Sequence, residues 1–338
     1  MSKKIVIQAV PTNIITGFLG VGKTSAIQHL LKSKPDNERW AILVNEFGEI
    51  GIDGALIQGQ STEESGVFIR EVPGGCMCCT AGVPMQVALN QLLSKSRPDR
   101  LLIEPTGLGH PVEVLKVLAE QQYQGVLSIQ KIITLVDARQ LSDYRYTEHE
   151  TFIQQVAIAD VIVGNKRDLY QQSDYGKLEQ FVLQHGLPQV NILATQQGAI
   201  DIAYLEGVSG AVADDTGLQA HHHDHNHEPH NEIRLDSIPM PVDGYVQAIN
   251  RGEGFQSVGW RFTSNQVFSH TKLFAVMLSL DAERVKGVFN TDEGAFGYNI
   301  AGDSIEQSEL KNCLESRIEI IAPQLSDDWG RRLLECII

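Results

Sequence analysis

Short β-rich runs alternate with longer amphipathic stretches over residues 10–210. Apolar runs with the length of strands are Asn13–Thr16, Ala41–Val44, Leu101–Glu104, Lys131–Val136, Val161–Val163 and Asn191–Leu193. Stretches with helical spacing are Lys23–Lys32, Val83–Leu93, Val112–Ala119, Glu148–Ile158 and Gly176–His185. This alternation is typical of a parallel sheet with helices on both faces. The sequence therefore predicts a doubly wound, mostly parallel α/β domain at 1–210.

The composition changes abruptly after this domain. Over residues 207–232, Gly, Asp, Ala and His replace the apolar periodicity, which predicts an exposed linker at 211–235. A smaller C-terminal α+β domain is expected at 236–338. Its predicted strands are Tyr245–Ile249, Ser257–Phe262, Val285–Phe289 and Arg317–Ile321, and its predicted helices lie near Thr271–Leu280 and Asp327–Leu334.

Two further features of the C-terminal region have a structural interpretation. Lys286–Gly287 and Asn290–Gly294 are expected to be turns of a β-ribbon. The aromatic residues are expected to be core residues and are assigned no chemistry; they are Trp260, Phe262, Phe268, Phe274 and Phe289.

Composition and charge exclude several classes of protein. The chain of 338 residues is 42% hydrophobic, and its apolar runs fall short of the ~18 residues that a membrane span needs. It has 27 Lys and Arg against 42 Asp and Glu, a formal charge of −15 that repels phosphate backbones and anionic lipids. We therefore expect neither nucleic acid nor membrane as a partner. Five cysteines, three of them within four residues, favour thiolate or metal chemistry in a reducing compartment, so a cytoplasmic location is predicted.

The first candidate site is a G-x-x-x-x-G-K-T motif that follows an apolar strand and opens a helix. Its glycines allow backbone N–H groups to surround a β-phosphate, and Lys23 reaches the β/γ oxygens. Thr24 is the expected ligand of Mg²⁺. The residues assigned to nucleotide binding here are Gly17, Gly20, Gly22, Lys23, Thr24 and Ser25.

A second phosphate element is the run LLIEPTG at 101–107. Glu104 ends an apolar strand and is expected to face the Mg²⁺ shell, while the N–H of Gly107 is expected to meet the γ-phosphate. Asp137 is the alternative acid, because it also follows an apolar strand; we prefer Glu104 because Asp137 lacks the glycine three residues later.

The identity of the base is predicted by N-K-x-D at 165–168. A carboxylate at Asp168 can accept hydrogen bonds from two guanine donors that adenine lacks, and the stem of Lys166 can cover the base. Asn165 completes the motif, and Thr195 occupies the usual place for contacts to the guanine carbonyl. Alone, such a four-residue match is often a surface turn, and a P-loop kinase or ATPase stays open if Asp168 does not read guanine.

Three thiols lie on one glycine-opened loop, at Cys76, Cys78 and Cys79. They offer soft ligands for Zn²⁺ and need one more donor to complete a tetrahedron. Co²⁺ and Ni²⁺ accept overlapping ligands and stay as alternatives. Buried structural cysteines and a redox pair are the competing interpretations, and the second lacks a plain C-x-x-C pattern.

With these motifs, the sequence resembles the CobW-type family of metallochaperone GTPases over nearly its whole length. The segments that carry the resemblance are Ile14–Thr24, Asn45–Asp53, Gly75–Cys79, Glu104–Pro111, Asn165–Asp168, the His-rich linker and the smaller C-terminal domain. The resemblance implies a P-loop GTPase that binds a transition metal at the C-x-C-C loop and passes it to a client protein. It also implies that Glu46 lies near the metal and Mg²⁺; a solvated loop is the alternative for that residue.

Catalysis is expected to be mainly electrostatic and the intrinsic turnover slow. Lys23 is assigned to charge neutralisation, and Glu46 and Glu104 are the candidates for positioning water. His110, three residues after Gly107, is a candidate switch or metal-side residue.

Six of the eleven histidines lie at 221–230, where loose capture of metal competes with a plain solvated linker. They are His221, His222, His223, His225, His227 and His230. The sequence thus predicts a Mg²⁺-dependent, GTP-hydrolysing metallochaperone that binds GTP and GDP, carries zinc first among metals and serves a client metalloprotein. The alternative is a GTP-gated metal buffer or sensor with the histidine run as its reservoir. A homodimer stays open.

Overall fold

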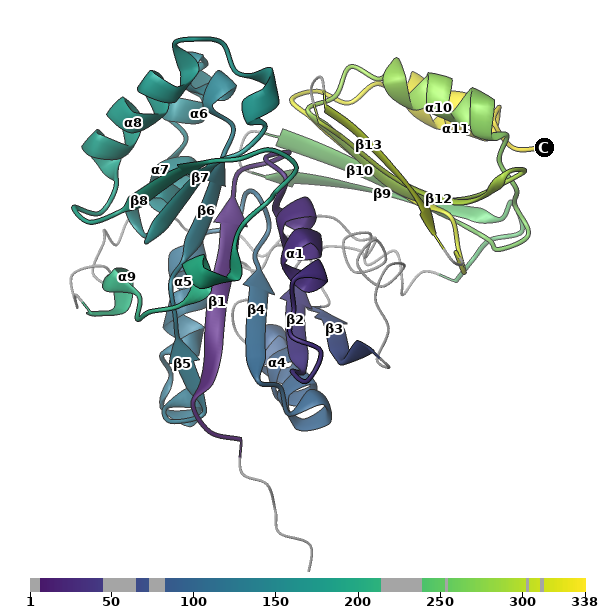
Figure 1. The fold of residues 1–338 in the computed structure, drawn as a ribbon. Helices are drawn as coiled ribbons and strands as arrows, with labels where there is room; N and C mark the ends of the chain where they lie inside the picture. Colours follow the sequence, from purple (N-terminus) through teal and green to yellow (C-terminus); the bar gives the residue numbers. More distant parts are fainter. Residues whose placement is uncertain are drawn as a thin grey trace, which may run out of the picture. The chain divides into compact units, whose positions relative to one another are not determined.

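Strand β1 (Val10–Gly17) lies in the middle of a parallel sheet in the computed structural model, which describes residues 7–44, 65–72, 83–213, 239–252, 255–301, 304–310 and 313–338. The strand order is β3-β2-β4-β1-β6-β7-β8, with β5 also paired to β1 (Figure 1). The other strands are β2 (Trp40–Val44), β3 (Val67–Glu71), β4 (Arg100–Glu104), β5 (Leu127–Ile129), β6 (Ile133–Val136), β7 (Val161–Gly164) and β8 (Asn191–Ala194). All their pairings are parallel, which confirms the predicted α/β class.

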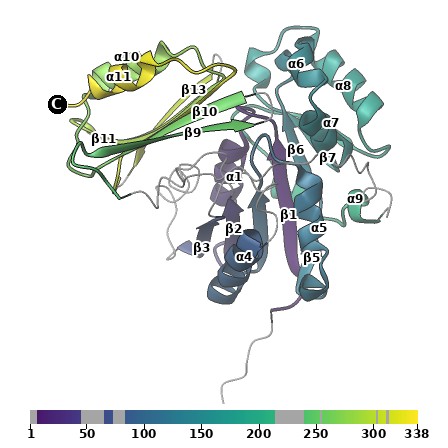
Figure 2. The same cartoon turned by 180° about the vertical axis from the view of Figure 1, so that it is seen from behind.

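Helices cover both faces of this sheet, as Figures 1 and 2 show from opposite sides. On one face α4 (Val83–Ser96) and α5 (Pro111–Leu118) bury apolar residues against Ile14, Leu43 and Ile103. On the other face α1 (Lys23–Lys32) packs on β1. The remaining helices of four or more residues are α6 (Tyr144–Thr147), α7 (Glu150–Ala157), α8 (Asp174–His185) and α9 (Gly210–Ala213). Short 3-10 turns lie at Gln121–Tyr123, Ala138–Ser142, Arg167–Leu169 and Ile202–Leu205.

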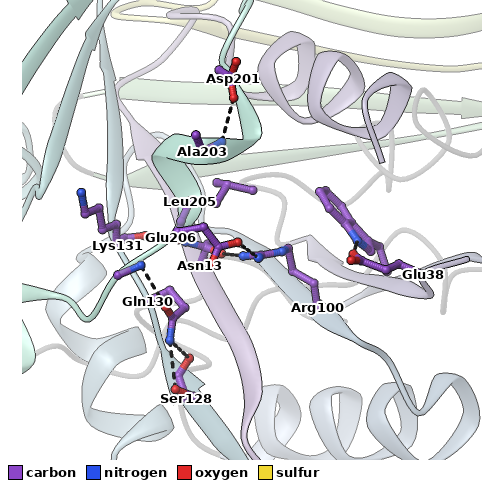
Figure 3. A network of polar contacts seen from close by, with 12 residues as sticks. Asn13, Glu38, Arg100, Ser128, Gln130, Lys131, Asp201, Ala203, Leu205 and Glu206 are labelled. Atoms are coloured by element: carbon purple, nitrogen blue, oxygen red, sulfur yellow. Dashed lines mark hydrogen bonds and ion pairs between the residues drawn. The ribbon is translucent and has the colours of Figure 1, made fainter. Parts of the chain in front are cut away.

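A buried polar network ties the segment after β8 to the sheet (Figure 3). The Arg100 guanidinium donates to Asn13 Oδ1 at 2.7 Å, pairs with Glu206 and lies over the ring of Trp40. The Asn13 amide donates to the carbonyl oxygens of Lys131, at 2.9 Å, and Leu205, at 2.7 Å. Because Arg100 and Asn13 are both buried, each of these bonds replaces water that the groups gave up on folding. The network therefore fixes the 3-10 turn at Ile202–Leu205 to β1 and β4.

The C-terminal unit is built on an antiparallel sheet with the strand order β13-β12-β11-β14-β10-β9. The strands are β9 (Tyr245–Gly252), β10 (Phe255–Phe262), β11 (Arg284–Thr291), β12 (Gly294–Ala301), β13 (Ser304–Leu310) and β14 (Arg317–Ala322). Helices α10 (His270–Leu278) and α11 (Asp328–Leu334) pack on one face of it. Between them lies an aromatic core that includes Trp260, Phe262, Phe268 and Phe289, with Phe274 at its edge, as predicted.

Two turns were expected in this unit, and the structure contains one of them. Lys286 and Gly287 were expected in a turn, but they lie within β11. Gly287 serves packing there, because a Cβ at this position would lie 2.6 Å from the ring of Phe289. The change of direction lies instead at 291–294, between β11 and β12, inside the expected Asn290–Gly294 turn. Residues 214–238, which include most of the predicted linker at 211–235, lie outside the described residues, so the domain boundaries at 210 and 235 stay predictions.

In the parts of the chain that the structure describes, no helix is long and apolar enough to cross a bilayer.

Candidate nucleotide-binding site

The loop between β1 and α1 carries the G-x-x-x-x-G-K-T motif. The Lys23 ammonium donates to the carbonyl oxygens of Gly17, at 2.9 Å, and Phe18, at 3.0 Å, so the side chain folds back over its own loop. Gly22 precedes α1 with φ +97°, a conformation that favours glycine. The loop thus leads directly into the N-terminus of α1, where the first backbone N–H groups and the helix dipole favour a bound phosphate.

Thr24 and Glu104 meet at the carboxyl edge of the sheet. Glu104 ends β4, the neighbour of β1, and its carboxylate is 2% exposed. The Thr24 hydroxyl donates to Glu104 Oε1 at 3.2 Å. A buried hydroxyl beside a buried carboxylate is a set of hard oxygen donors, which fits Mg²⁺ by its chemistry.

Asp137, the alternative acid, has different partners. Its carboxylate accepts from Arg139 Nε at 3.0 Å and Nη2 at 2.7 Å, and Lys166 Nζ lies 3.8 Å away. It also caps the 3-10 turn at Ala138–Ser142 by accepting from the backbone N–H of Arg139. This carboxylate is therefore engaged with cations at the end of β6, one of which is the predicted base-reading residue Lys166.

Asn165 joins the base-reading loop to the P-loop. It follows β7, is 2% exposed, and donates from Nδ2 to the carbonyl oxygen of Val21 at 2.9 Å. Its Oδ1 accepts from the N–H of Gly198 at 3.0 Å. A Cβ on Gly22 would lie 2.5 Å from Asn165 Nδ2, so the amide packs directly on the phosphate loop.

The rest of the N-K-x-D motif surrounds this amide. Lys166 adopts φ +60° and Asp168 is exposed in the 3-10 turn at Arg167–Leu169. Thr195 lies beside them, because its N–H donates to Gly164 and its carbonyl accepts from Arg167. Within the described ranges the Asp168 carboxylate accepts no hydrogen bond, so both of its oxygens can face a ligand. The structure thus brings the four predicted base-reading residues to one edge of the sheet.

Tyr170 is a site neighbour that the sequence did not indicate. Its hydroxyl accepts from the N–H of Ala138 at 3.1 Å, linking the loop after β7 to the end of β6. Burial is the main cause that raises the pKa of Tyr170 to about 12. The hydroxyl is therefore neutral near pH 7, where it can serve as a donor and an acceptor.

Gly107 lies against the P-loop. A Cβ at this position would lie 2.9 Å from the backbone nitrogen of Leu19, so only glycine permits the approach. Its carbonyl accepts from Gln155 Nε2 at 3.0 Å. At the other end of the same turn, His110 Nδ1 lies 3.0 Å from Gln154 Oε1.

The predicted transition-metal ligands lie outside the described residues, and one of them, Glu46, is also a predicted catalytic acid. They are Glu46, Cys76, Cys78, Cys79 and the six histidines of 221–230. Among the residues that are described, no group of three or more His, Cys, Asp or Glu side chains is placed to hold a metal ion.

Comparisons with known proteins identify the family of this chain. Residues 11–190 match the family model described as "CobW/HypB/UreG, nucleotide-binding domain". The chain is 39% identical over 322 residues to the "Zinc chaperone YeiR" of Escherichia coli (strain K12), covering 94% of each chain. It is 28% identical over 259 residues to the "Zinc chaperone CobW" of Sinorhizobium sp, covering 69% of this chain and 73% of that protein. The crystal structure of Zn(II)-bound YjiA GTPase from E. coli matches with 19% identity and a TM-score of 0.44, over 97% and 99% of the two chains.

The central parallel sheet, the P-loop and the loops at its carboxyl edge define a P-loop nucleotide-binding protein. The chain belongs to the CobW/HypB/UreG family of P-loop GTPases. This confirms the family resemblance found in the sequence.

Proposed function

We propose that this protein is a GTP-hydrolysing metallochaperone that carries zinc to a client protein under nucleotide control. The observation that carries the nucleotide half is the contact between Thr24 Oγ1 and Glu104 Oε1, at 3.2 Å beneath the P-loop. The metal half is supported by two relatives that are similar to this chain over most of its length, both of which are named zinc chaperones. Zinc is the cargo, with Co²⁺ or Ni²⁺ as alternatives.

The nucleotide is held by side chains from separate elements. Lys23 exchanges its present carbonyl partners, Gly17 and Phe18, for the β/γ oxygens of the triphosphate. Thr24 and Glu104 would hold Mg²⁺, which when bound would neutralise charge on those oxygens. Asp168 accepts from guanine, Lys166 covers the base and Thr195 contributes backbone contacts. Gly107 donates its N–H toward the γ-phosphate.

The cargo is held elsewhere in the chain. Cys76, Cys78 and Cys79 supply thiolates, and Glu46 is the candidate fourth ligand. Glu46 or Glu104 positions the attacking water. Because Glu104 is buried next to Thr24, we assign it first to Mg²⁺.

A Glu104→Gln variant tests the nucleotide half. The substitution keeps the shape and an oxygen for Thr24 but removes the charge next to Mg²⁺, so GTP hydrolysis should fall and the Mg²⁺ concentration for half-maximal rate should rise. Glu113→Gln, at an exposed site on α5, is the matched control. An unchanged Mg²⁺ dependence in Glu104→Gln would place the ion at another acid. Competition between GTP and ATP in the wild type separates this function from a kinase or ATPase.

The alternative function, a GTP-gated metal buffer or sensor, predicts a different role for the histidine run. Deleting residues 221–230 should remove most of the zinc capacity of a buffer and little of the transfer activity of a chaperone. The measurement is zinc bound at saturation, followed by zinc transfer to a chelator in the presence of GTP. The predicted cytoplasmic location stays a prediction.

A further inference from the structure

Helix α7 carries a buried glutamine, Gln155, whose side chain is 0% exposed. The buried residues of α7 are Thr151, Phe152, Gln155 and Val156, which share one face of the helix by their spacing. A fully buried carboxamide in such a face is costly unless its donors and acceptor are paired. Its contacts therefore need an explanation beyond the filling of space.

The carboxamide is paired on one side only. Its Nε2 donates to the carbonyl oxygen of Gly107 at 3.0 Å. Its buried Oε1 has no hydrogen-bond partner among the described residues. Turning the amide over would place Oε1 against the Gly107 oxygen, so this carbonyl fixes the orientation. An apolar side chain of the same size would leave no buried oxygen without a partner. Such a side chain would lose only the hydrogen bond to Gly107.

The backbone of Gly107 must be held in place by contacts with other residues. The close approach to Leu19 excludes a side chain at this position, and glycine has the greatest backbone freedom of any residue. A hydrogen bond to its carbonyl fixes the peptide plane between Gly107 and Leu108, which limits the backbone rotation that would move the N–H of Gly107. The bond from Gln155 supplies that restriction.

Helix α7 is itself positioned on the P-loop. The ring of Phe18 packs edge-on against His149, with centroids 4.8 Å apart, and against Phe152, at 6.0 Å. The hydroxyl of Thr134 on β6 also donates to the main-chain carbonyl oxygen of Gln155 at 2.7 Å. The Gln155 side chain therefore starts from an element anchored to both the phosphate loop and the sheet, and it holds Gly107 at a set distance from them.

We infer that Gln155 is a positioning residue that holds Gly107 against the P-loop and thereby sets how strongly the protein distinguishes GTP from GDP. This inference rests on the proposed function, because it requires the N–H of Gly107 to meet the γ-phosphate. GDP has no γ-phosphate, so the bond from Gln155 contributes to GTP binding and leaves GDP binding unchanged.

A Gln155→Met variant of the full chain tests this role. Methionine keeps the length and volume and exchanges one orphaned acceptor, Oε1, for another, the Gly107 oxygen. Thermal stability should therefore change little. The ratio of affinities for a non-hydrolysable GTP analogue and GDP should fall about 2- to 13-fold, the range that one ordinary hydrogen bond spans. Gln155→Leu, which is uncharged and has no donor, is the second variant if the first does not fold.

Gln266→Met is the matched control. Gln266 lies in the C-terminal unit and also donates from Nε2 to a backbone carbonyl, that of Asp243, at 3.2 Å. Its Oε1 is likewise buried and has no partner in the part of the chain that the structure describes. Its affinity ratio should equal that of the wild type. An unchanged ratio in the Gln155 variants, or an equal loss of both affinities, overturns the inference and leaves Gln155 a core residue. A wild type that binds neither nucleotide overturns the proposed function as well.

Discussion

Replacing Asn165 by aspartate tests whether the base-reading loop and the P-loop act as one unit. The Asn165 amide bridges the Val21 carbonyl, at 2.9 Å, and the Gly198 N–H, at 3.0 Å. Aspartate has nearly the same shape and can still accept from Gly198. It cannot donate to Val21 when ionised, so two oxygens then face each other at a buried position.

The cost follows from these contacts. Leaving one buried carbonyl unpaired costs about 1–3 kcal/mol, and a buried ionised carboxylate adds to this. If the strain falls on the P-loop, guanine-nucleotide affinity should fall about 5- to 150-fold. The assay is displacement of a fluorescent GDP analogue, with the free energy of unfolding measured in parallel by urea titration. The exposed Asn191, at the start of β8, provides the control Asn191→Asp. If the Asn165→Asp variant loses the expected free energy of unfolding but binds nucleotide with wild-type affinity, the coupling of the two loops is refuted.

Three further perturbations address single groups. Lys23→Ala should remove most triphosphate affinity, because the ammonium is the side-chain cation of the P-loop, and equilibrium binding of GTP that matches the wild type would refute this site. Asp168→Asn should weaken GTP binding and reduce the preference over ATP, since an amide cannot accept from both guanine donors; a retained preference in competition assays would move base reading elsewhere. The pKa of Tyr170, raised to about 12 from 10.0, means that the folded state keeps this proton when the unfolded state has lost it. Stability from Tyr170 is present below about pH 10 and is lost as pH rises through about pH 12, so Tyr170→Phe should lose less unfolding free energy across that window than the wild type; equal losses would contradict the burial argument.

The sequence predicted the central strands because their apolar runs are continuous, as in Ala41–Val44, where both faces are buried. It missed β3, whose pattern is mostly half-buried, and β5, which has three residues. In the C-terminal unit it missed β12 and β13. The first contains two glycines, and the second, at the edge of its sheet, has five polar residues among its seven. Neither composition favours a strand.

The candidate site, like the fold, could be predicted only in part. Its motif residues could be predicted because each motif is local and lies where a strand meets a helix or loop. The contacts between motifs could not, because they depend on the packing of distant segments: Asn165 reaches Val21 across 144 positions, and Gln155 reaches Gly107 across 48. Gln155 belongs to no motif, and the N-K-x-D motif that contains Asn165 does not indicate a contact with Val21.

The most direct test of nucleotide-controlled metal carriage is a calorimetric zinc titration of the full chain with a GTP analogue, with GDP and without nucleotide. If GTP and zinc favour one conformation, each must raise the affinity of the other by the same factor, about 5 to 150 for typical couplings. We expect the tightest zinc binding with the GTP analogue, weaker binding as pH falls and thiolates protonate, and loss of the nucleotide effect in Cys78→Ser. Equal zinc affinities in the three nucleotide states would contradict it.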